Sequence, residues 1–217
     1  MNIEQARFNM IEQQIRPWDV LDQEVLGLLS IVKREHYVPA AYRDLAFADI
    51  ELPLPGGHKM LFPRVEARVL QDLAVKKHES VLLIGAGSGY LAALFAHRGH
   101  HVTAVDIDPA IAQLATDNLR NDGVTNVEVV VGDGSRGWSA KAPYDVICVS
   151  GGLPAVPQEL LEQLKVGGRL SAFVGGRPVM KAQVITRLDE KQYRVADVFE
   201  TYVDHLVNAI EPSRFKF

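Results

Sequence analysis

A short apolar run followed by a glycine-rich turn constrains the fold of this chain more than any other feature. Residues 80–84 read Ser-Val-Leu-Leu-Ile, and Gly85, Gly87 and Gly89 follow directly. A fully apolar run of this length predicts a strand that is buried on both faces. Glycines after such a strand let the backbone reverse sharply, so that a ligand can approach main-chain N–H groups. The pattern favours an α/β protein with a parallel sheet.

Downstream of the turn, predicted helices alternate with short apolar strands. A helix is expected over residues 90–97, and Asp108-Pro109 supplies an N-cap and a first-turn proline for another that runs to about residue 121. Part of a further helix is expected over residues 160–164. The other strands are expected over residues 102–105, 127–131, 146–149 and 170–174. Strands without alternation that are separated by helices are typical of a parallel sheet covered on both faces.

The C-terminal part of the chain follows a different pattern. Residues 183–188 and 193–203 alternate between apolar and polar side chains, and the polar turn 189–191 separates them. This pattern predicts a hairpin, so the sheet should end in an antiparallel pair of strands.

The first residues of the chain are predicted to form helices that precede the sheet. The first helix should carry on one face Phe8, Ile11 and Ile15. Arg16-Pro17 is expected to end this helix, and Asp19 is expected to cap a second one, which Val38-Pro39 would close. The buried face of the second helix should consist of Val25, Leu28, Leu29 and Val32.

Proline and glycine are concentrated in residues 52–63, which are therefore expected to form an irregular loop. A third helix should follow, with a buried stripe of Val65, Val69, Leu70 and Leu73. A chain of 217 residues suits a single domain. In this domain, residues 1–78 would form a helical front with the loop, and residues 79–217 would form the α/β core.

Composition and charge restrict the classes of partner. The formal net charge is −4 and the isoelectric point is near 6.0, which argues against a nucleic-acid-binding surface. No apolar stretch approaches the roughly 20 residues that a membrane span needs. The first residues also lack the basic and apolar regions of a signal peptide. We therefore expect neither a nucleic-acid partner nor a membrane partner.

Cysteine and histidine usage bears on compartment and metal binding. Cys148 is the only cysteine, which excludes an internal disulfide, and its apolar neighbours predict a buried thiol. A reducing, cytoplasmic setting is expected. His97, His100 and His101 lie around Gly99 without a cysteine or carboxylate among them, so no metal site is expected.

Two carboxylates follow neighbouring strands of the predicted sheet. Asp106 ends the second strand, about twenty residues after the first glycine, where an acidic side chain can accept both ribose hydroxyls of a nucleotide. Asp133 follows the third strand and should lie at the same edge, unless it only forms a turn beside Gly134. Asp108 is interpreted as a helix cap. Together with the glycine turn, the two carboxylates point to an adenosine-type cofactor. Tyr90 stands where the dinucleotide pattern has its third glycine, which disfavours a nicotinamide cofactor.

Longer stretches around this site carry a family resemblance. In the core they read VLLIGAGSGY (81–90), GDG (132–134), PYDVI (143–147) and LKVGGRL (164–170). In the front they read MIEQQI (10–15), VL (25–26), REHYVP (34–39) and LPLP (52–55). Together these stretches resemble the protein-L-isoaspartate O-methyltransferase family.

The resemblance implies a Rossmann-like class I methyltransferase with a seven-stranded, mostly parallel sheet, an antiparallel last strand and an N-terminal helical extension. It implies S-adenosylmethionine as methyl donor, with S-adenosylhomocysteine as product. The acceptor would be the carboxylate of an isomerised aspartate in a damaged protein or peptide, which suggests a role in protein repair. The expected cofactor contacts are Gly85, Ala86, Gly87, Ser88, Gly89, Asp106, Ile107, Asp133 and Gly134.

Methylation of a carboxylate demands little from protein side chains. The acceptor is already ionised at neutral pH, so no general base is required. The rate should come from alignment of the reacting atoms and from exclusion of water. The expected contribution of the protein is therefore a set of hydrogen bonds that orient the acceptor carboxylate.

The chain departs from the family pattern in the acceptor loop. The family reads Gly-Gln-Thr-Ile-Ser-Gln-Pro, whereas residues 57–63 read Gly-His-Lys-Met-Leu-Phe-Pro. The family serine thus aligns with Leu61, which has no hydrogen-bond donor in its side chain. Residues 205–210 also match the family's substrate-binding strand poorly, and Leu83 replaces a glutamate that is usual in the first strand.

Two explanations of the changed loop remain open. In the first, a basic side chain takes over recognition of the acceptor carboxylate, and the candidates are His58, Lys59 and Arg64. In the second, the loop serves a different acceptor, or the chain is a non-catalytic S-adenosylmethionine-binding protein. A nicotinamide-dependent oxidoreductase is a third hypothesis, which Tyr90 disfavours.

Overall fold

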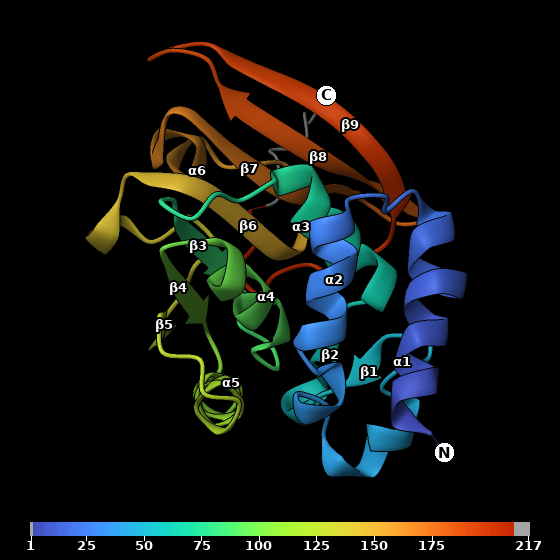
Figure 1. Ribbon diagram of the computed structural model, residues 1–217. Coiled ribbons are helices and arrows are strands. Elements are labelled where there is room, and N and C mark those ends of the chain that lie inside the picture. The colour runs from blue at the N-terminus through green and yellow to red at the C-terminus, as the bar shows by residue number, and fades with distance from the viewer. Residues whose placement is uncertain (1, 211–217) are drawn as a thin grey trace.

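The computed structural model describes residues 2–210, and its centre is a seven-stranded sheet in the order β5-β4-β3-β6-β7-β8-β9. The strands are β3 (Ser80–Ile84), β4 (His101–Asp106), β5 (Val127–Val131), β6 (Tyr144–Leu153), β7 (Leu164–Gly176), β8 (Val179–Arg187) and β9 (Tyr193–Thr201). Strands β3 to β7 are parallel, and β8 is antiparallel to both of its neighbours. The expected mostly parallel sheet with an antiparallel end is confirmed (Figure 1).

Helices pack on both faces of this sheet. The helices are α1 (Ile3–Met10), α2 (Gln23–Ile31), α3 (Pro63–Leu73), α4 (Tyr90–Arg98), α5 (Pro109–Asn121) and α6 (Gln158–Glu162). In β3, Leu83 joins an apolar cluster with residues of α1 to α5, whereas Leu82 and Ile84 join a second cluster with Leu160 of α6. These three β3 side chains are at most 2% exposed, as expected for a parallel strand covered on both faces.

The front differs from its sequence prediction at its first helix. After α1 the chain continues as a π-helical turn, η1 (Ile11–Ile15), and a 3-10 turn, η2 (Arg16–Trp18). Ile11 and Ile15 are buried, but Phe8 is 58% exposed, so the prediction that it shares their face is wrong. The buried side chains of α1 are instead Arg7 and Met10, and the wide π turn departs from the 3.6-residue period only from Ile11 onward.

The second helix begins and ends at residues other than those expected. Its cap is Asp22, whose carboxylate accepts hydrogen bonds from the backbone N–H groups of Glu24 and Val25, whereas Asp19 adopts a left-handed conformation. The helix ends at Ile31, before the proline that was expected to close it. Its predicted buried face is confirmed for Val25, Leu28, Leu29 and Val32.

The remaining segments are short. The expected irregular loop contains the two-stranded pair β1 (Leu52–Pro53) and β2 (Lys59–Met60) and the turn η5 (Pro55–Gly57). Further 3-10 turns are η3 (Arg34–His36), η4 (Ala40–Leu45) and η6 (Ser139–Lys141). Leu164, expected at the end of a helix, instead begins β7, because α6 stops at Glu162.

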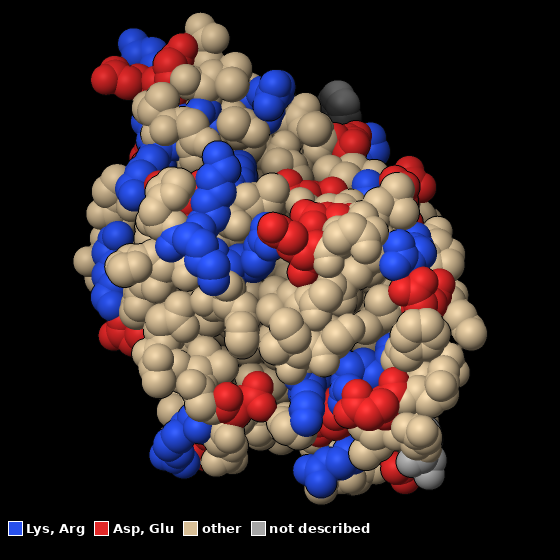
Figure 2. Space-filling view, in the orientation of Figure 1, with Lys and Arg blue, Asp and Glu red and all other residues tan. Residues whose placement is uncertain are grey.

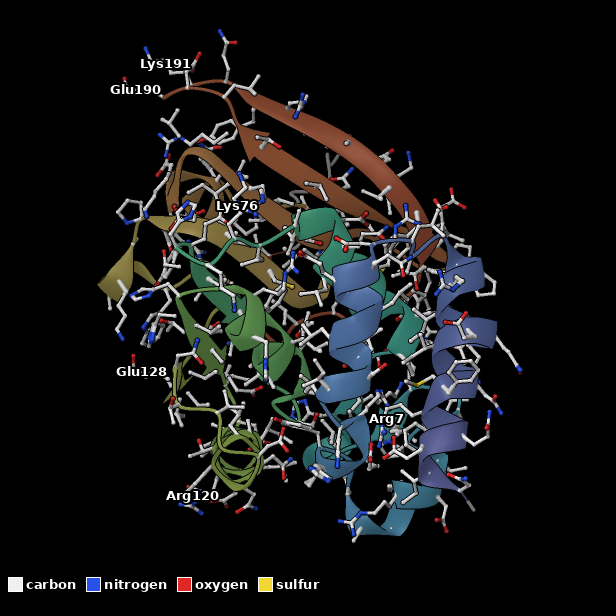
Figure 3. The ribbon with its side chains drawn as sticks, in the orientation of Figure 1. Arg7, Lys76, Arg120, Glu128, Glu190 and Lys191 are labelled. Atoms are coloured by element: carbon white, nitrogen blue, oxygen red, sulfur yellow. The ribbon has the colours of Figure 1, made fainter. Side chains whose placement is uncertain are left out.

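Buried charged side chains join the front segments to one another. Arg7 is 2% exposed and pairs with Glu35 of η3, and Figure 3 shows Arg7 on the inner side of α1. The same figure shows Glu190 and Lys191 at the tip of the β8–β9 hairpin, where a polar turn was predicted. Over the face drawn in Figure 2, Lys and Arg lie beside Asp and Glu in several places. Within residues 2–210, no helix combines the length and the apolar character needed to cross a membrane.

Candidate active site

A cavity of about 320 Å³ lies at the carboxyl edge of the parallel strands. Its floor is formed by the ends of the strands and the turns that follow them, through Ile84, Gly85, Gly87, Val105, Asp106, Ile107, Asp133, Gly134, Ser135, Ser150 and Gly151. One wall comes from the acceptor loop and the residues just before it, through Glu51, Gly56, Gly57, His58, Lys59 and Leu61. The other wall is the segment after β9, residues 203–207. Ligands bind at this edge of open α/β sheets, which makes the cavity the candidate active site.

The glycine turn between β3 and α4 needs its glycines for two reasons. Gly85, Gly87 and Gly89 all have positive φ angles, of 86°, 55° and 87°. A Cβ atom on Gly85 would lie 2.2 Å from the hydroxyl oxygen of Ser150 on β6. A Cβ on Gly89 would lie 3.1 Å from the carbonyl oxygen of Ala115, so this glycine lets α4 begin close to α5. The turn therefore exposes its backbone to the cavity while it stays packed against two neighbouring elements.

Asp106 closes the floor of the cavity beside this turn. It is 7% exposed, and its two carboxylate oxygens accept hydrogen bonds from the backbone N–H groups of Gly87 and Asp108, both at 3.1 Å. Ile107 follows it on the cavity wall. Asp108 caps α5 by accepting a hydrogen bond from the N–H of Ala110, as predicted. A carboxylate held in this way can accept hydrogen bonds from the hydroxyls of a ribose.

Asp133 is fixed at the neighbouring strand end. One of its oxygens accepts a hydrogen bond from the backbone N–H of Ser135 at 2.9 Å, and the other accepts one from the side-chain amide of Asn208 at 3.0 Å. Burial opposes ionisation, but these hydrogen bonds outweigh it and hold the pKa of Asp133 below its usual value. Asp133 is therefore a hydrogen-bond acceptor at neutral pH.

The acceptor loop places two basic side chains on the cavity wall. The Nε2 atom of His58 lies 3.3 Å from a carboxylate oxygen of Asp108. The Nζ atom of Lys59 lies 2.7 Å from a carboxylate oxygen of Asp204 and 3.7 Å from one of Glu51. The hydrogen bond to Asp204 and the charge of Glu51 raise the pKa of Lys59. An ammonium ion thus lies in the cavity at neutral pH.

Two further residues of interest are Leu61 in the loop and Arg64 in the first turn of α3. Leu61 is buried, and its carbonyl oxygen accepts a hydrogen bond from Arg34 at 2.9 Å. Arg64 does not line the cavity. It forms an ion pair with Asp49, and its guanidinium lies 4.7 Å and 4.4 Å from the ring centres of Trp18 and Phe62. Of the three basic candidates, the structure brings His58 and Lys59 to the cavity and leaves Arg64 in the packing of the front.

Most of the expected cofactor residues meet at this cavity. Gly85, Gly87, Asp106, Ile107, Asp133 and Gly134 line it. Ala86 and Ser88 are buried within the turn, and Gly89 is the N-cap residue of α4, so these three shape the site without lining it. A neutral to acidic set of hydrogen-bond acceptors beside exposed backbone fits an adenosine-type cofactor such as S-adenosylmethionine. In residues 2–210, no group of three or more His, Cys, Asp or Glu side chains is arranged to hold a metal ion.

Several residues that line the cavity were not predicted from the sequence. Cys148 pairs with Ser171, but Gly152 pairs with Phe173, so residues 149–151 bulge out of the ladder between β6 and β7 and bring Ser150 and Gly151 to the cavity. Bulges are common beside active sites, and the glycine pair 151–152 after an apolar run was the available signal. Glu51 and Asp204 had no local signal, because their place depends on contacts between distant parts of the chain.

Comparison with known proteins identifies the family. A model of the protein-L-isoaspartate(D-aspartate) O-methyltransferase family matches residues 5–207. A protein-L-isoaspartate O-methyltransferase of Methanoculleus marisnigri is 40% identical over 192 residues, which cover 88% of this chain and 86% of that protein. One of Rhodopseudomonas palustris is 40% identical over 186 residues, with 85% of each chain covered.

Solved structures agree with this fold. One protein-L-isoaspartate O-methyltransferase superposes with a TM-score of 0.79 at 25% identity, over 94% of this chain and 66% of that one. A Plasmodium falciparum protein described as a candidate of the same type, in complex with S-adenosyl-L-homocysteine, superposes with a TM-score of 0.79 at 15% identity, over 98% of this chain and 100% of that one. The chain therefore belongs to the protein-L-isoaspartate(D-aspartate) O-methyltransferase family, a family of S-adenosylmethionine-dependent methyltransferases.

Proposed function

We propose that this chain transfers a methyl group from S-adenosylmethionine to the carboxylate of an isomerised aspartate in a protein or peptide. One observation carries this proposal. A single cavity holds the glycine turn and Asp106 on its floor and the ammonium group of Lys59 on its wall. The cavity thus offers a place for the donor beside a cation for the acceptor.

The floor of the cavity suits the donor. Asp106 would accept hydrogen bonds from the ribose hydroxyls, and the backbone around Gly85 and Gly87 would lie along the rest of the molecule. Asp133 and Gly134 complete this end of the cavity. When bound, S-adenosylmethionine supplies a methyl group that is already activated by the positive sulfur.

Lys59 is proposed to orient the acceptor. Its ammonium group carries three N–H donors and attracts an anion, whereas the side chain of Leu61 has no donor. His58 lies next to it on the same wall, and a ring N–H of its imidazole can serve as a second donor. With the acceptor already ionised, these groups need only hold one carboxylate oxygen in line with the methyl group and keep water away.

A different acceptor is the second candidate, and the buried Leu61 is the observation that favours it. Leu61, at the family's serine position, is only 8% exposed, and its backbone carbonyl oxygen already accepts a hydrogen bond from Arg34. An apolar side chain here suits a less polar methyl acceptor. It also suits a protein that binds S-adenosylmethionine without transferring the methyl group. Product formation separates these possibilities.

The experiment uses methyl-labelled S-adenosylmethionine, an isoaspartyl peptide and the matching normal aspartyl peptide. Cofactor bound to the protein is measured in the same samples. Base-labile label on the isoaspartyl peptide alone is the expected result, since a methyl ester is labile to base. Tight cofactor binding without label on either peptide would favour the second candidate, and the absence of cofactor binding would contradict both.

Three wider inferences go with this activity. Methylation of isomerised aspartate would give the chain a role in repair of damaged proteins. The front, residues 1–78, and the core, residues 79–217, would act as one methyltransferase domain, because both contribute residues to the cavity and to one apolar cluster. The only cysteine, Cys148, is a buried free thiol, which suits a reducing, cytoplasmic setting.

A further inference from the structure

The ammonium group of Lys59 already contacts a carboxylate of the chain itself. A carboxylate oxygen of Asp204 lies 2.7 Å from Nζ of Lys59, and one of Glu51 lies 3.7 Å from it. All three residues line the candidate active site. Burial raises the pKa of Glu51, whereas the hydrogen bond to Lys59 lowers that of Asp204. Lys59 therefore already has an anionic partner, Asp204, where the proposed acceptor would bring another carboxylate.

Backbone contacts fix Asp204 at this position. The segment after β9 adds to the bulged end of β6, since the N–H of Gly152 donates to the carbonyl oxygen of Asp204 and the N–H of Leu206 donates to that of Gly152, each at 2.9 Å. His205 forms an isolated parallel bridge with Gly152. The backbone therefore holds the carboxylate opposite Lys59, 145 positions away in the sequence.

The side chain of Asp204 remains free to turn away from Lys59. It is 54% exposed, compared with 24% for that of Glu51. Its closest side-chain hydrogen-bond partner is Lys59, at 2.7 Å, and the hydroxyl of Tyr202 and the guanidinium of Arg177 lie near the same carboxylate. The hydrogen bond to Lys59 holds the pKa of Asp204 below its usual value, so this carboxylate is charged under working conditions.

We propose that Asp204 is an intramolecular competitor of the acceptor carboxylate for Lys59, and so sets the affinity of the enzyme for acidic acceptors. This assignment rests on the proposed function. An acceptor carboxylate has to displace the carboxylate of Asp204 from the ammonium group before it is aligned for methylation. Lys59 therefore contributes to acceptor binding only the difference in free energy between its ion pair with the acceptor and its ion pair with Asp204. It does not contribute the full free energy of a new ion pair.

The test is a gain in affinity, which a loss of structure cannot produce. Asp204→Asn keeps the size of the side chain and removes its charge. At low ionic strength, KM for an isoaspartyl peptide should fall by about two- to five-fold, and kcat should not fall, since an exposed ion pair is lost as a competitor. Added salt should shrink the difference, because it screens charges at the exposed wall.

Two further variants make this test specific. Lys59→Met should raise KM, and in that background Asp204→Asn should bring no further gain. Asp197→Asn is the matched control, since Asp197 on β9 pairs with Lys181, is 45% exposed and lies outside the cavity. It removes the same charge and should leave KM within experimental error of the unmodified enzyme.

The outcomes separate this assignment from the proposed function. If the unmodified enzyme methylates the isoaspartyl peptide but Asp204→Asn leaves KM unchanged or raises it, the assignment is overturned and the function stands. The same holds if Asp197→Asn lowers KM as much, or if Asp204→Asn still lowers KM without Lys59. If neither the unmodified enzyme nor any variant labels the peptide, the proposed function fails and the assignment fails with it.

Discussion

Replacement of Asp106 by alanine tests the cofactor end of the cavity. The change removes a carboxylate that lies at the cavity floor and is 7% exposed. Hydroxyls of a bound ribose would lose a charged acceptor, which costs about 1–3 kcal/mol. At about 1.4 kcal/mol for each factor of ten, the affinity for S-adenosylhomocysteine should fall by roughly five- to 150-fold.

The same substitution should also weaken the fold. The backbone N–H groups of Gly87 and Asp108 both donate to Asp106 at 3.1 Å and would lose this partner. Because water in the cavity can replace part of the bonding, we expect the free energy of unfolding to fall by about 1–3 kcal/mol. For a chain of 217 residues this corresponds to a decrease of about 2–12 °C in Tm.

The assay is isothermal titration with S-adenosylhomocysteine at a temperature where circular dichroism shows that the variant is folded. Asp117→Ala is the control, since Asp117 lies on the exposed side of α5, pairs with Arg120 and does not line the cavity. It should leave the affinity unchanged. If Asp106→Ala bound the ligand within twofold of the unmodified protein, the placement of the ribose would be refuted.

Three further predictions concern the packing around the site. Burial raises the pKa of the Cys148 thiol, so a thiol reagent should label it only after unfolding, and rapid labelling of the native protein would contradict this. Gly89→Val should lower the free energy of unfolding in urea by about 1–3 kcal/mol, because the φ angle of 87° at this position is strained for valine. An unchanged midpoint of urea unfolding would show that the backbone is not strained by the substitution. Arg34→Met should cost about 3–5 kcal/mol, since it leaves Glu66 buried without its partner, and Arg34→Met with Glu66→Leu should recover part of the loss. If the losses of the two single variants simply added up in the double variant, the cycle would show no interaction energy between Arg34 and Glu66.

Local patterns were enough to predict the elements that build the cavity floor. Apolar runs of strand length gave the parallel strands, and the Asp-Pro pair at 108–109 gave the start of α5. The glycine turn could be recognised because positive φ angles at Gly85, Gly87 and Gly89 restrict these positions to glycine. In each case a few neighbouring residues determine the conformation, so the sequence is informative.

The parts that were not predicted depend on alternatives with similar local energies. Asp19 and Asp22 are both suitable caps, and packing of the front selected Asp22. Phe8 was expected on the buried face of the first helix, but α1 buries Arg7 and Met10 instead and leaves Phe8 exposed. Arg64 had the right charge for an acceptor site, yet tertiary contacts with Asp49 hold it elsewhere.

The walls of the cavity were the hardest part to predict. Lys59 was a candidate from its charge alone, but its partner Asp204 is 145 residues away, and no local pattern reports such a contact. The bulge in β6 likewise depends on the register with β7. These long-range contacts decide which side chains face the acceptor, so they required the structure.

The most direct measurement is a crystal structure of the protein with S-adenosylhomocysteine and an isoaspartyl peptide bound together. Our account predicts the ribose against Asp106, the peptide carboxylate within hydrogen-bond distance of Nζ of Lys59, and the carboxylate of Asp204 turned away from that atom. A peptide carboxylate held by other groups while Lys59 still contacts Asp204 would contradict the proposed acceptor site. A cofactor bound away from Asp106 would contradict the account of the cavity as a whole.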